Sequence, residues 1–355
     1  MIISRTPFRV SFFGGGTDYP AHFVDHGGAV LATTIDKHCY ITCRYLPPFF
    51  RHKSRIAYSK IELVGDLEQI EHPAVREVLR FMRITEGVEI HHDADLPART
   101  GLGSSSSFTV GLLHALYALR QSMPTKNQLA REAIRIERDV LKENVGSQDQ
   151  ASAAYGGFNK IVFNPDHTLT LAPVILPQER LSRFQDHLML YFTGFSRTAS
   201  EIAKEQVENT AAKKAELLRM RRMVDEAVDI LSGSGDLGDF GRLLHESWTL
   251  KRGLSSRIST PLIDEIYETA RSSGALGGKL LGAGGGGFVL LFARPEEQPA
   301  IKKRLSKLLL VPFRFESAGS HIIFYDHATA TRNDLDGPGR LAAGPERGPV
   351  VIPAK

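Results

Sequence analysis

Alternating apolar and polar residues predict β-strands along much of the chain. In residues 2–13, the side chains of Phe8, Val10 and Phe12 fall on one face of an extended strand. Arg9 falls on the opposite face, so we expect its guanidinium to point away from the main apolar surface. The other predicted strands cover residues 29–43, 55–58, 61–64, 88–96, 189–193, 288–292, 311–316 and 321–325, with short strands and turns between residues 160 and 181.

Apolar residues spaced three and four apart predict helices between these strands. The predicted helices cover residues 73–83, 108–119, 125–143, 200–231, 237–250, 261–272 and 295–309. In the helix at 125–143, Thr125 and Gln128 have the spacing of a capping box. Glu137 lies at the border of its apolar stripe, and the pattern leaves open whether Glu137 is a surface carboxylate paired with nearby Arg and Lys residues.

A glycine–serine loop precedes the predicted helix at 108–119. Residues 96–107 read Leu-Pro-Ala-Arg-Thr-Gly-Leu-Gly-Ser-Ser-Ser-Ser and follow a predicted strand. Glycines let the backbone approach an anion closely, and the first N–H groups of a helix have no partner within it. The order of strand, loop and helix therefore suits a phosphate site, although a flexible linker is the alternative for such a loop taken alone. No Lys-Ser or Lys-Thr closes the loop, so it is not a Walker motif.

Two other glycine runs lie beside predicted strands. Gly14–Gly16 follow the first strand, and a plain turn would explain them but would leave Arg9 and Asp18 as two solvated residues flanking it. Gly284–Gly287 lead directly into the strand at 288–292, which a linker would not do, so we expect this backbone to pack tightly against something. Asp149 lies in a segment too rich in small and apolar residues for an ordinary solvated acid.

Composition places the chain among globular proteins. It has 355 residues, of which 42% are hydrophobic and 24% charged, and this length is enough for two domains. The formal net charge is only +4, and the basic residues are interleaved with acidic ones. We therefore expect anionic small molecules as ligands and no nucleic acid.

The two cysteines and the first residues of the sequence indicate the cellular compartment in which we expect the protein. Cys39 and Cys43 share one face of a predicted strand, and no second Cys or His pair completes a zinc site, so we expect core thiols. Such sparing use of thiols suits a reducing compartment. The first residues lack the charged and apolar blocks of a signal peptide, and no run of about eighteen apolar residues occurs. We expect a cytoplasmic protein with no membrane association.

The three glycine motifs together resemble those of the GHMP small-molecule kinases, the family of galactokinase, homoserine kinase and mevalonate kinase. The first motif is Thr-Pro-Phe-Arg-Val-Ser-Phe-Phe-Gly-Gly-Gly-Thr-Asp-Tyr at 6–19, the second is the loop at 96–107, and the third is Lys-Leu-Leu-Gly-Ala-Gly-Gly-Gly-Gly-Phe at 279–288. The resemblance implies an α/β (α+β) fold of two domains with the active site between them. It places a ribosomal-protein-like N-terminal domain, which binds ATP, at 1–185 and a ferredoxin-like C-terminal domain at 186–326. Residues 327–355 lose all periodicity, and we expect a disordered or loosely packed tail there.

The resemblance also assigns roles, with ATP and Mg²⁺ as cofactors. Asp149 matches the general base and Arg9 the cation beside it, while Ser105 and Glu137 match the metal ligands. The residues that match the nucleotide site are Pro97, Thr100, Gly101, Leu102, Gly103, Ser104, Ser105 and Ser106. We expect the substrate site to include Gly14, Gly15, Gly16, Thr17, Asp18, Asp36, Lys37, Gly284, Gly285 and Arg197. Phosphoryl transfer relies on positioning and charge neutralisation, which a backbone cradle, a metal and a carboxylate supply.

The first motif also bears on the substrate. Galactokinases carry Gly-Glu-His-Thr-Asp where this chain has three glycines before Thr17 and Asp18, so galactose is disfavoured. The glycine version is similar to that of D-glycero-α-D-manno-heptose 7-phosphate 1-kinases and, less closely, of fucokinases. The resemblance implies an ATP-dependent sugar 1-kinase acting on the way to GDP-heptose and surface polysaccharide.

Three alternatives stay open: a kinase for fucose, a kinase for unphosphorylated mannoheptose, and a non-catalytic nucleotide-binding protein. A phosphorylated sugar requires a second anion site. The candidate cations for it are Lys37, Arg99, Arg197, Lys251 and Arg252. We consider a homodimer as the assembly.

Overall fold

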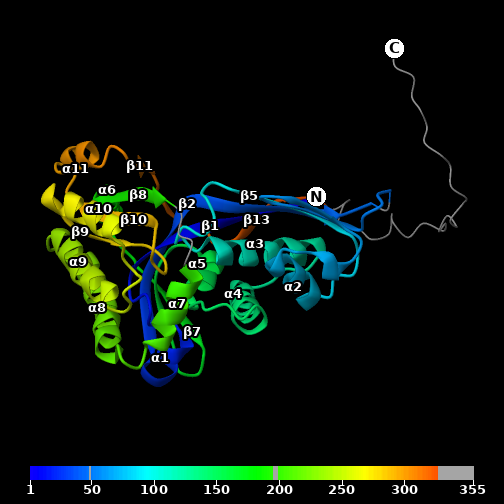
Figure 1. Ribbon diagram of the computed structural model, residues 1–355, viewed down its shortest axis with the longest axis horizontal. Helices are drawn as coiled ribbons and strands as arrows, with labels where there is room; N and C mark the ends of the chain where they lie inside the picture. Colours follow the sequence, from blue (N-terminus) through cyan, green and yellow to red (C-terminus); the bar gives the residue numbers. More distant parts are fainter. Residues whose placement is uncertain (48, 195–198, 327–355) are drawn as a thin grey trace, which may run out of the picture.

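The computed structural model describes residues 1–47, 49–194 and 199–326. The predicted tail at 327–355 lies outside the described residues, as does Arg197. Within the described residues the strands form a nine-stranded sheet and a four-stranded sheet, which lie at opposite ends of an elongated molecule (Figure 1).

The strands, in chain order, are β1 Ile2–Phe13, β2 Gly28–Tyr45, β3 Ser54–Ala57, β4 Ile61–Val64, β5 Val88–Ala94, β6 Phe158–Phe163, β7 Leu169–Pro173, β8 Leu188–Gly194, β9 Ala275–Leu280, β10 Gly287–Ala293, β11 Leu309–Leu310, β12 Phe315–Glu316 and β13 His321–Tyr325. The α-helices are α1 Pro20–His26, α2 Pro73–Phe81, α3 Ser104–Leu119, α4 Lys126–Ile134, α5 Gln148–Tyr155, α6 Gln178–Asp186, α7 Ala199–Glu208, α8 Lys214–Ser232, α9 Gly238–Arg252, α10 Pro261–Ser272 and α11 Gln298–Arg304. A 3₁₀ turn covers Leu67–Gln69, and a π-helix covers Arg135–Val140 directly after α4.

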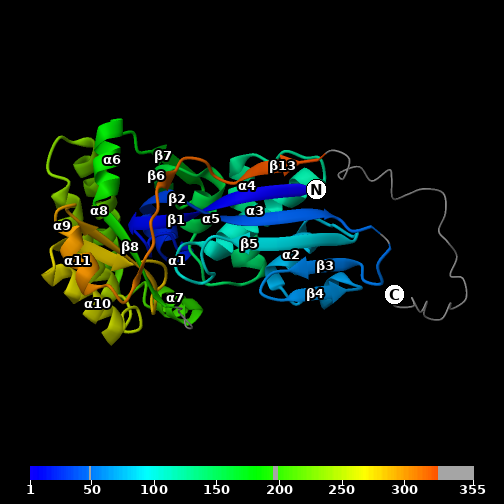
Figure 2. The same cartoon turned by 90° about the horizontal axis from the view of Figure 1, so that it is seen from above.

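The large sheet is organised around the 18-residue strand β2. It runs antiparallel to β1 along most of its length, pairing Arg9 with Thr34 and Ile2 with Cys43. Its second half also pairs with β5 and its first half with β6, so the sheet divides in two along β2. Helices α2, α3, α4 and α5 lie on one face of this sheet (Figures 1 and 2). The apolar helix α3 packs directly on β1 and β2, which brings its first residues close to Arg9.

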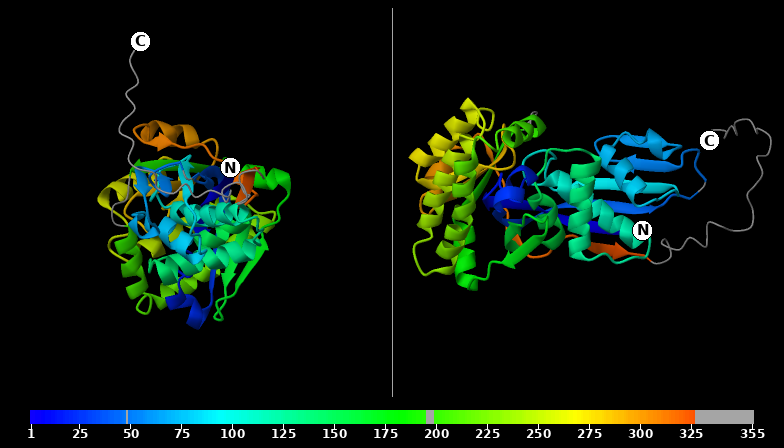
Figure 3. Two further views of the ribbon diagram at one scale, coloured as in Figure 1. Left: turned by 90° about the vertical axis from the view of Figure 1, so that its right-hand side faces the viewer. Right: turned by 90° about the horizontal axis from the view of Figure 1, so that it is seen from below.

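The small sheet has the strand order β11-β8-β10-β9, all antiparallel. Helices α8, α9 and α10 gather at the same end of the molecule, as Figure 3 shows from below. The two ends share one apolar core. Phe12 and Phe13, at the end of β1, lie with their ring centroids 5.5 and 5.0 Å from that of Phe240 in α9. The first glycine motif therefore leaves β1 at the junction of the two sheets.

The end of the described chain returns to the large sheet. β12 pairs with β2, and β13 pairs with β1 on the edge of that sheet. The predicted division at residue 185 stays a prediction, but this return means that residues 315–325 share a sheet with the first half of the chain.

Several predicted elements have the expected place. The strands at 2–13 and 88–94 and the helix beginning at residue 73 are present, and Thr125 accepts a hydrogen bond from the Gln128 N–H as the N-cap of α4. Both cysteines are buried and free, as expected of core thiols.

Other predicted elements were wrong in extent. The helix predicted at 200–231 is broken between α7 and α8, and at the break the Asn209 side chain donates to the carbonyl of Leu254. The α-helix predicted at 125–143 ends at Ile134 and continues as a π-helix. The helix at 295–309 is shortened to α11, and the strand at 311–316 is reduced to β12.

Candidate active site

An ion pair between Arg9 and Asp149 lies at the centre of the site. The guanidinium donates from Nε to Oδ1 at 2.7 Å and from Nη2 to Oδ2 at 2.9 Å, the two-bond geometry that makes such pairs strong. Its third nitrogen, Nη1, donates to the carbonyl of Gly101 at 2.7 Å. Arg9 points away from the main apolar face of β1, as predicted, but it is only 4% exposed because the second glycine motif covers it. The Asp149 side chain keeps 26% of its surface exposed, so its carboxylate can meet a ligand.

The second glycine motif forms the loop that leads into α3. The Arg9 N–H donates to the carbonyl of Leu102, and the hydroxyl of Thr100 donates to the carbonyl of Pro97, which fixes the shape of the loop. Gly103 is the N-cap residue in the left-handed region, at φ +76°, and no side chain caps the helix. The first N–H groups of α3 therefore stay open to an anion at the positive end of the helix.

Gly103 also separates that helix end from the ion pair. A Cβ at Gly103 would lie 3.2 Å from Cγ of Arg9 and 3.4 Å from Cγ of Asp149. The open N–H groups and the carboxylate are thus neighbours, as transfer of a phosphoryl group requires.

The second and third glycine motifs touch backbone to backbone. A Cβ at Gly282 would lie 2.4 Å from Cα of Gly101, and one at Gly287 would lie 2.3 Å from the Thr100 carbonyl oxygen. Gly284 and Gly285 turn against Ile258, whose carbonyl accepts from the Gly285 N–H at 3.0 Å. The tight packing expected of this run is present, and its partner is the loop before α3.

The first glycine motif holds Asp18 close to the Arg9–Asp149 ion pair. Thr17 donates to the carbonyl of Gly14, and the Asp18 carboxylate accepts from the N–H groups of Gly16 at 3.1 Å and Gln148 at 3.4 Å. Asp18 is 1% exposed. Burial, and secondly the nearby charge of Asp149, raise the pKa of Asp18 to about 6.

Glu137 lies inside the protein next to the second motif. Its side chain is fully buried, which excludes the interpretation as a surface carboxylate. Oε2 accepts from Ser106 Oγ at 2.8 Å and from Gln150 Nε2 at 2.5 Å, whereas the buried Oε1 has no hydrogen-bond partner among the described residues. Burial raises the pKa of Glu137 to about 7. π-Helical turns are frequent at functional sites, and in this one Ile136 and Glu137 are buried while Arg135, Asp139 and Val140 are exposed.

Two buried lysines lie under the third motif. Lys251 Nζ donates to the carbonyls of Leu280 at 3.1 Å and Gly282 at 2.6 Å, and Lys279 Nζ donates to that of Phe12 at 2.9 Å. Neither has a carboxylate partner among the described residues. Burial lowers the pKa of Lys251 to about 7 and that of Lys279 well below its ordinary value, with nearby Arg9 adding to both effects.

Some predicted site residues are not brought to this centre. Asp36 exchanges backbone and side-chain hydrogen bonds with Arg314, and Lys37 lies 3.5 Å from the Asp36 carboxylate. Ser105 is exposed on the first turn of α3, where it makes no bond to Glu137; the serine that does so is Ser106. The roles of Asp36, Lys37 and Ser105 stay predictions.

The candidate cations for a substrate phosphate differ in their partners and in their exposure. Lys251 is committed to backbone carbonyls, and Arg252 pairs with Asp264 at 3.0 Å. Arg99 is exposed on the second motif, at φ +61°. The sequence places neither Gln150 nor Lys279 in the active centre, and it suggests Lys251 only as a candidate cation for a substrate phosphate. A polar side chain in a run of small or apolar residues is the signal that marks Gln150 and Lys279.

Within the described residues, no group of three or more His, Cys, Asp or Glu side chains is arranged to hold a metal ion. A cation here would therefore depend on Glu137, hydroxyl groups, water and phosphate oxygens, the mixed shell that Mg²⁺ commonly keeps. Among the helices that the structure describes, none combines the length and apolar character needed to cross a bilayer.

The chain is similar to several known proteins. It is 29% identical over 323 residues to the D-glycero-α-D-manno-heptose 7-phosphate kinase of Campylobacter jejuni, covering 86% of this chain and 93% of the relative. It is 26% identical to the L-fucokinase/L-fucose-1-P guanylyltransferase of Bacteroides fragilis, covering 86% of this chain but 36% of that longer protein. The crystal structure of a D-glycero-D-manno-heptose 1-phosphate kinase from Bacteroides thetaiotaomicron matches with a TM-score of 0.68 at 26% identity, covering 92% of this chain and all of that one.

Two family models match separate parts of the chain. Residues 70–157 match the model of the GHMP kinases N-terminal domain, and residues 223–309 match that of the GHMP kinases C-terminal domain. The first range contains the second glycine motif, Glu137 and Asp149, and the second range contains both buried lysines and the third motif. The chain has the two-domain GHMP kinase fold and belongs to the GHMP kinase family.

Proposed function

We propose that the protein is an ATP-dependent kinase that phosphorylates the anomeric hydroxyl of D-glycero-α-D-manno-heptose 7-phosphate. The observation that carries the proposal is the Arg9–Asp149 pair, which lies against Gly103 at the open N-terminus of α3. A carboxylate beside an anion cradle is what transfer of a phosphoryl group to a hydroxyl needs.

Each side chain of the site then has a defined task. Asp149 orients the sugar hydroxyl and accepts its proton as the hydroxyl oxygen bonds to the γ-phosphorus. The bond from that phosphorus to the bridging oxygen of ATP breaks, and ADP leaves. Arg9 holds the Asp149 carboxylate in place through two hydrogen bonds and, through its bond to Gly101, fixes the distance of that carboxylate from the loop that would hold the triphosphate.

The residues around Glu137 fit a magnesium ion. Oε1 of Glu137 is buried without a partner, and a carboxylate oxygen is a ligand that Mg²⁺ prefers. Glu137 and Ser105 would hold the ion, and a bound Mg²⁺ neutralises charge on the β- and γ-phosphates. Ser106 and Gln150 would orient the carboxylate through its other oxygen, Oε2.

The choice of sugar rests on the first glycine motif and on the relatives. Gly15 and Gly16 stand where galactokinases carry Glu and His, and a Cβ at Gly15 would meet nothing within 4 Å. The Campylobacter relative, matched over nearly its whole length, is named for a heptose 7-phosphate. The Bacteroides structure is named as a heptose 1-phosphate kinase, so the position of the transferred phosphate is the point an experiment must decide.

Phosphorus NMR of the products from a sugar panel tests the proposal. The panel contains heptose 7-phosphate, unphosphorylated mannoheptose and fucose, each with ATP and Mg²⁺. We expect a new anomeric phosphate on heptose 7-phosphate alone, giving the 1,7-bisphosphate. A product only with fucose would favour the alternative raised by the Bacteroides fragilis relative. Phosphorylation of none of the three would refute the proposal and favour a nucleotide-binding protein without this activity.

A further inference from the structure

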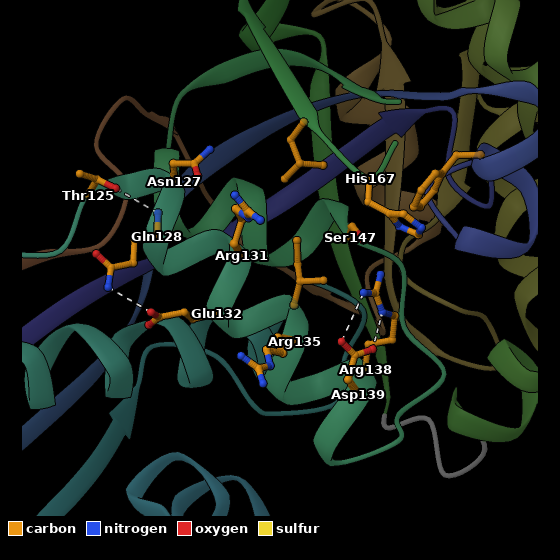
Figure 4. A pocket seen from close by; sticks show the side chains of 13 residues that line it. Thr125, Asn127, Gln128, Arg131, Glu132, Arg135, Arg138, Asp139, Ser147 and His167 are labelled. Carbon is orange, nitrogen blue, oxygen red and sulfur yellow. Dashed lines mark hydrogen bonds and ion pairs between the residues drawn. The ribbon is translucent and has the colours of Figure 1, made fainter. Parts of the chain in front are cut away.

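A cavity of about 500 Å³ opens on the first half of the chain, away from the site described above. It lies between the helical segment formed by α4 and the π-helix and the turn joining β6 to β7, as Figure 4 shows. None of the motif glycines, Arg9, Asp18, Glu137 or Asp149 lines it. Any ligand in this cavity would therefore occupy a second site.

Three arginines line the cavity: Arg131, Arg135 and Arg138. In Figure 4 the side chains of Arg131 and Arg138 extend to the same side of the helical segment, whereas that of Arg135 extends to the other. The side chain of Arg131 makes no hydrogen bond or ion pair within the described residues, and Arg135 lies 5.6 Å from the centre of the Phe81 ring. Only Arg138 has a carboxylate, bonded to Asp139 at 2.8 Å.

The acidic residues of the cavity offset only part of this positive charge. Glu132 accepts from the hydroxyl of Tyr117 and from Gln128, and neither of these partners is charged. Asp139 is hydrogen-bonded to Arg138 and also interacts electrostatically with Arg135. Three guanidinium groups against two engaged carboxylates leave a net positive lining, and guanidinium groups match phosphate oxygens in geometry.

Other lining residues add an aromatic and apolar surface. His167 stands on the β6–β7 turn at φ +64° and meets the Phe23 ring edge to face at 5.4 Å. Phe23, Ile134 and Leu169 also line the cavity. A pocket with both cationic and apolar lining residues suits a phosphate ester with a compact organic body.

We propose that this cavity binds a small phosphorylated organic molecule and that binding there alters the rate of the kinase reaction. Ser147 lines the cavity, and its N–H donates to the carbonyl of Asp18 at 3.1 Å. The π-helix that presents Arg135 and Arg138 to the cavity carries Glu137 on its inner side. A ligand in the cavity thus contacts both segments that position acidic residues of the active site.

Calorimetry with phenyl phosphate tests the binding. The full chain is first saturated with Mg²⁺ and a non-hydrolysable ATP analogue, so that the nucleotide site is closed to the probe. We expect one further site for phenyl phosphate. Its affinity falls about tenfold in Arg131→Gln and in Arg138→Gln, a loss typical of a charge-assisted hydrogen bond. Arg83→Gln, an exposed arginine outside the cavity, is the matched control and leaves the affinity unchanged.

The kinetic half of the proposal is measured on the same variants. Phenyl phosphate is expected to change kcat or KM of the wild type about twofold or more, and to leave Arg131→Gln unaffected; Arg131 is exposed, so its loss leaves the fold intact. No binding at millimolar probe, or equal binding in all three variants, refutes the site. Binding with unchanged kinetics refutes the regulatory effect. Activity on the sugars is measured without phenyl phosphate. A lack of activity on heptose 7-phosphate would therefore contradict the proposed function and would not bear on binding in the cavity.

Discussion

The two groups of buried cations at the junction of the sheets have different partners. Arg9 bonds a carboxylate through two nitrogens, and that carboxylate is partly exposed. Lys251 and Lys279 bond only backbone carbonyls and are fully enclosed. The charge of Arg9 is therefore balanced within the protein, whereas burial lowers the pKa of both lysines.

From this difference we infer separate roles: Arg9 takes part in the proposed reaction, whereas the two lysines hold the structure together. A cation paired with an accessible carboxylate can contribute to a reaction, because it holds the carboxylate in a fixed position where a ligand can reach it. A buried lysine that donates hydrogen bonds only to backbone carbonyls instead holds two segments of the chain together. Lys251 connects α9 to the third glycine motif, and Lys279 connects β9 to the end of β1. Variants in the Arg9–Asp149 region should thus change turnover first, and variants in the lysine region should change stability first.

The largest effect is expected from Asp149→Asn. The amide cannot accept the proton of the sugar hydroxyl, so kcat should fall about 10³-fold, within the range known for general bases. Stability should also fall, by roughly 2 kcal/mol, because Asn keeps one bond from Arg9 but removes the counter-charge of this buried guanidinium. Steady-state kinetics with heptose 7-phosphate measure the loss, and Asp229→Asn, an exposed aspartate of α8, is the control. Wild-type turnover in Asp149→Asn would refute the assignment of the reaction to the Arg9–Asp149 region.

The next prediction concerns Asp18, which interacts electrostatically with both regions. Its pKa is raised from 3.8 to about 6 in the folded state, so its contribution to stability is present at low pH and is lost as pH rises through that interval. The loss amounts to at most about 3 kcal/mol, since one pKa unit is about 1.4 kcal/mol. Asp18→Asn should match the wild type near pH 4 and exceed it above pH 6.

Urea unfolding at both pH values measures the difference. Kinetics on the same protein should show a raised KM for the sugar if Asp18 holds its hydroxyls. A variant with the same pH dependence as the wild type would mean that Asp18 does not carry the titration.

A smaller loss is expected from Glu137→Gln. The amide can still accept from Ser106 but is a poorer magnesium ligand, so the Mg²⁺ concentration for half-maximal rate should rise about 10- to 100-fold. Magnesium titrations of the rate measure this change. Glu143→Gln, an exposed neighbour, controls for loss of charge near the π-helix. An unchanged magnesium requirement would assign Glu137 a purely structural part.

The smallest effect tests the contact between the second and third motifs. Gly282 has φ +73°, and a Cβ there would lie 2.4 Å from Cα of Gly101. Gly282→Ala should lower the free energy of unfolding by roughly 2 kcal/mol, from backbone strain and displacement of the loop. Gly235→Ala, where a Cβ meets nothing within 4 Å, is the control. Equal stability of the two variants would show that the contact is loose.

The sequence predicted more of the site than of its surroundings. Alternation along β1 gave the direction of Arg9, and the strand–loop–helix order gave the anion cradle at α3. Local pattern could not reveal that Glu137 is buried, because the π-helix that turns it inward depends on contacts with α3 and α5. The break between α7 and α8 was missed for the same reason, since the bond that accompanies it reaches Leu254, far along the chain.

By itself, the sequence determined the kinds of element, the three glycine motifs and the residue types that phosphoryl transfer needs, because these follow from periodicity and from side-chain chemistry. Only the tertiary structure decided which of them meet. Arg9 and Asp149 are 140 residues apart, and Gly101 and Gly282 are brought into contact by packing between the two sheets. The pKa values of Asp18 and Lys251 likewise depend on burial, which is a property of the folded chain and of no single stretch of it.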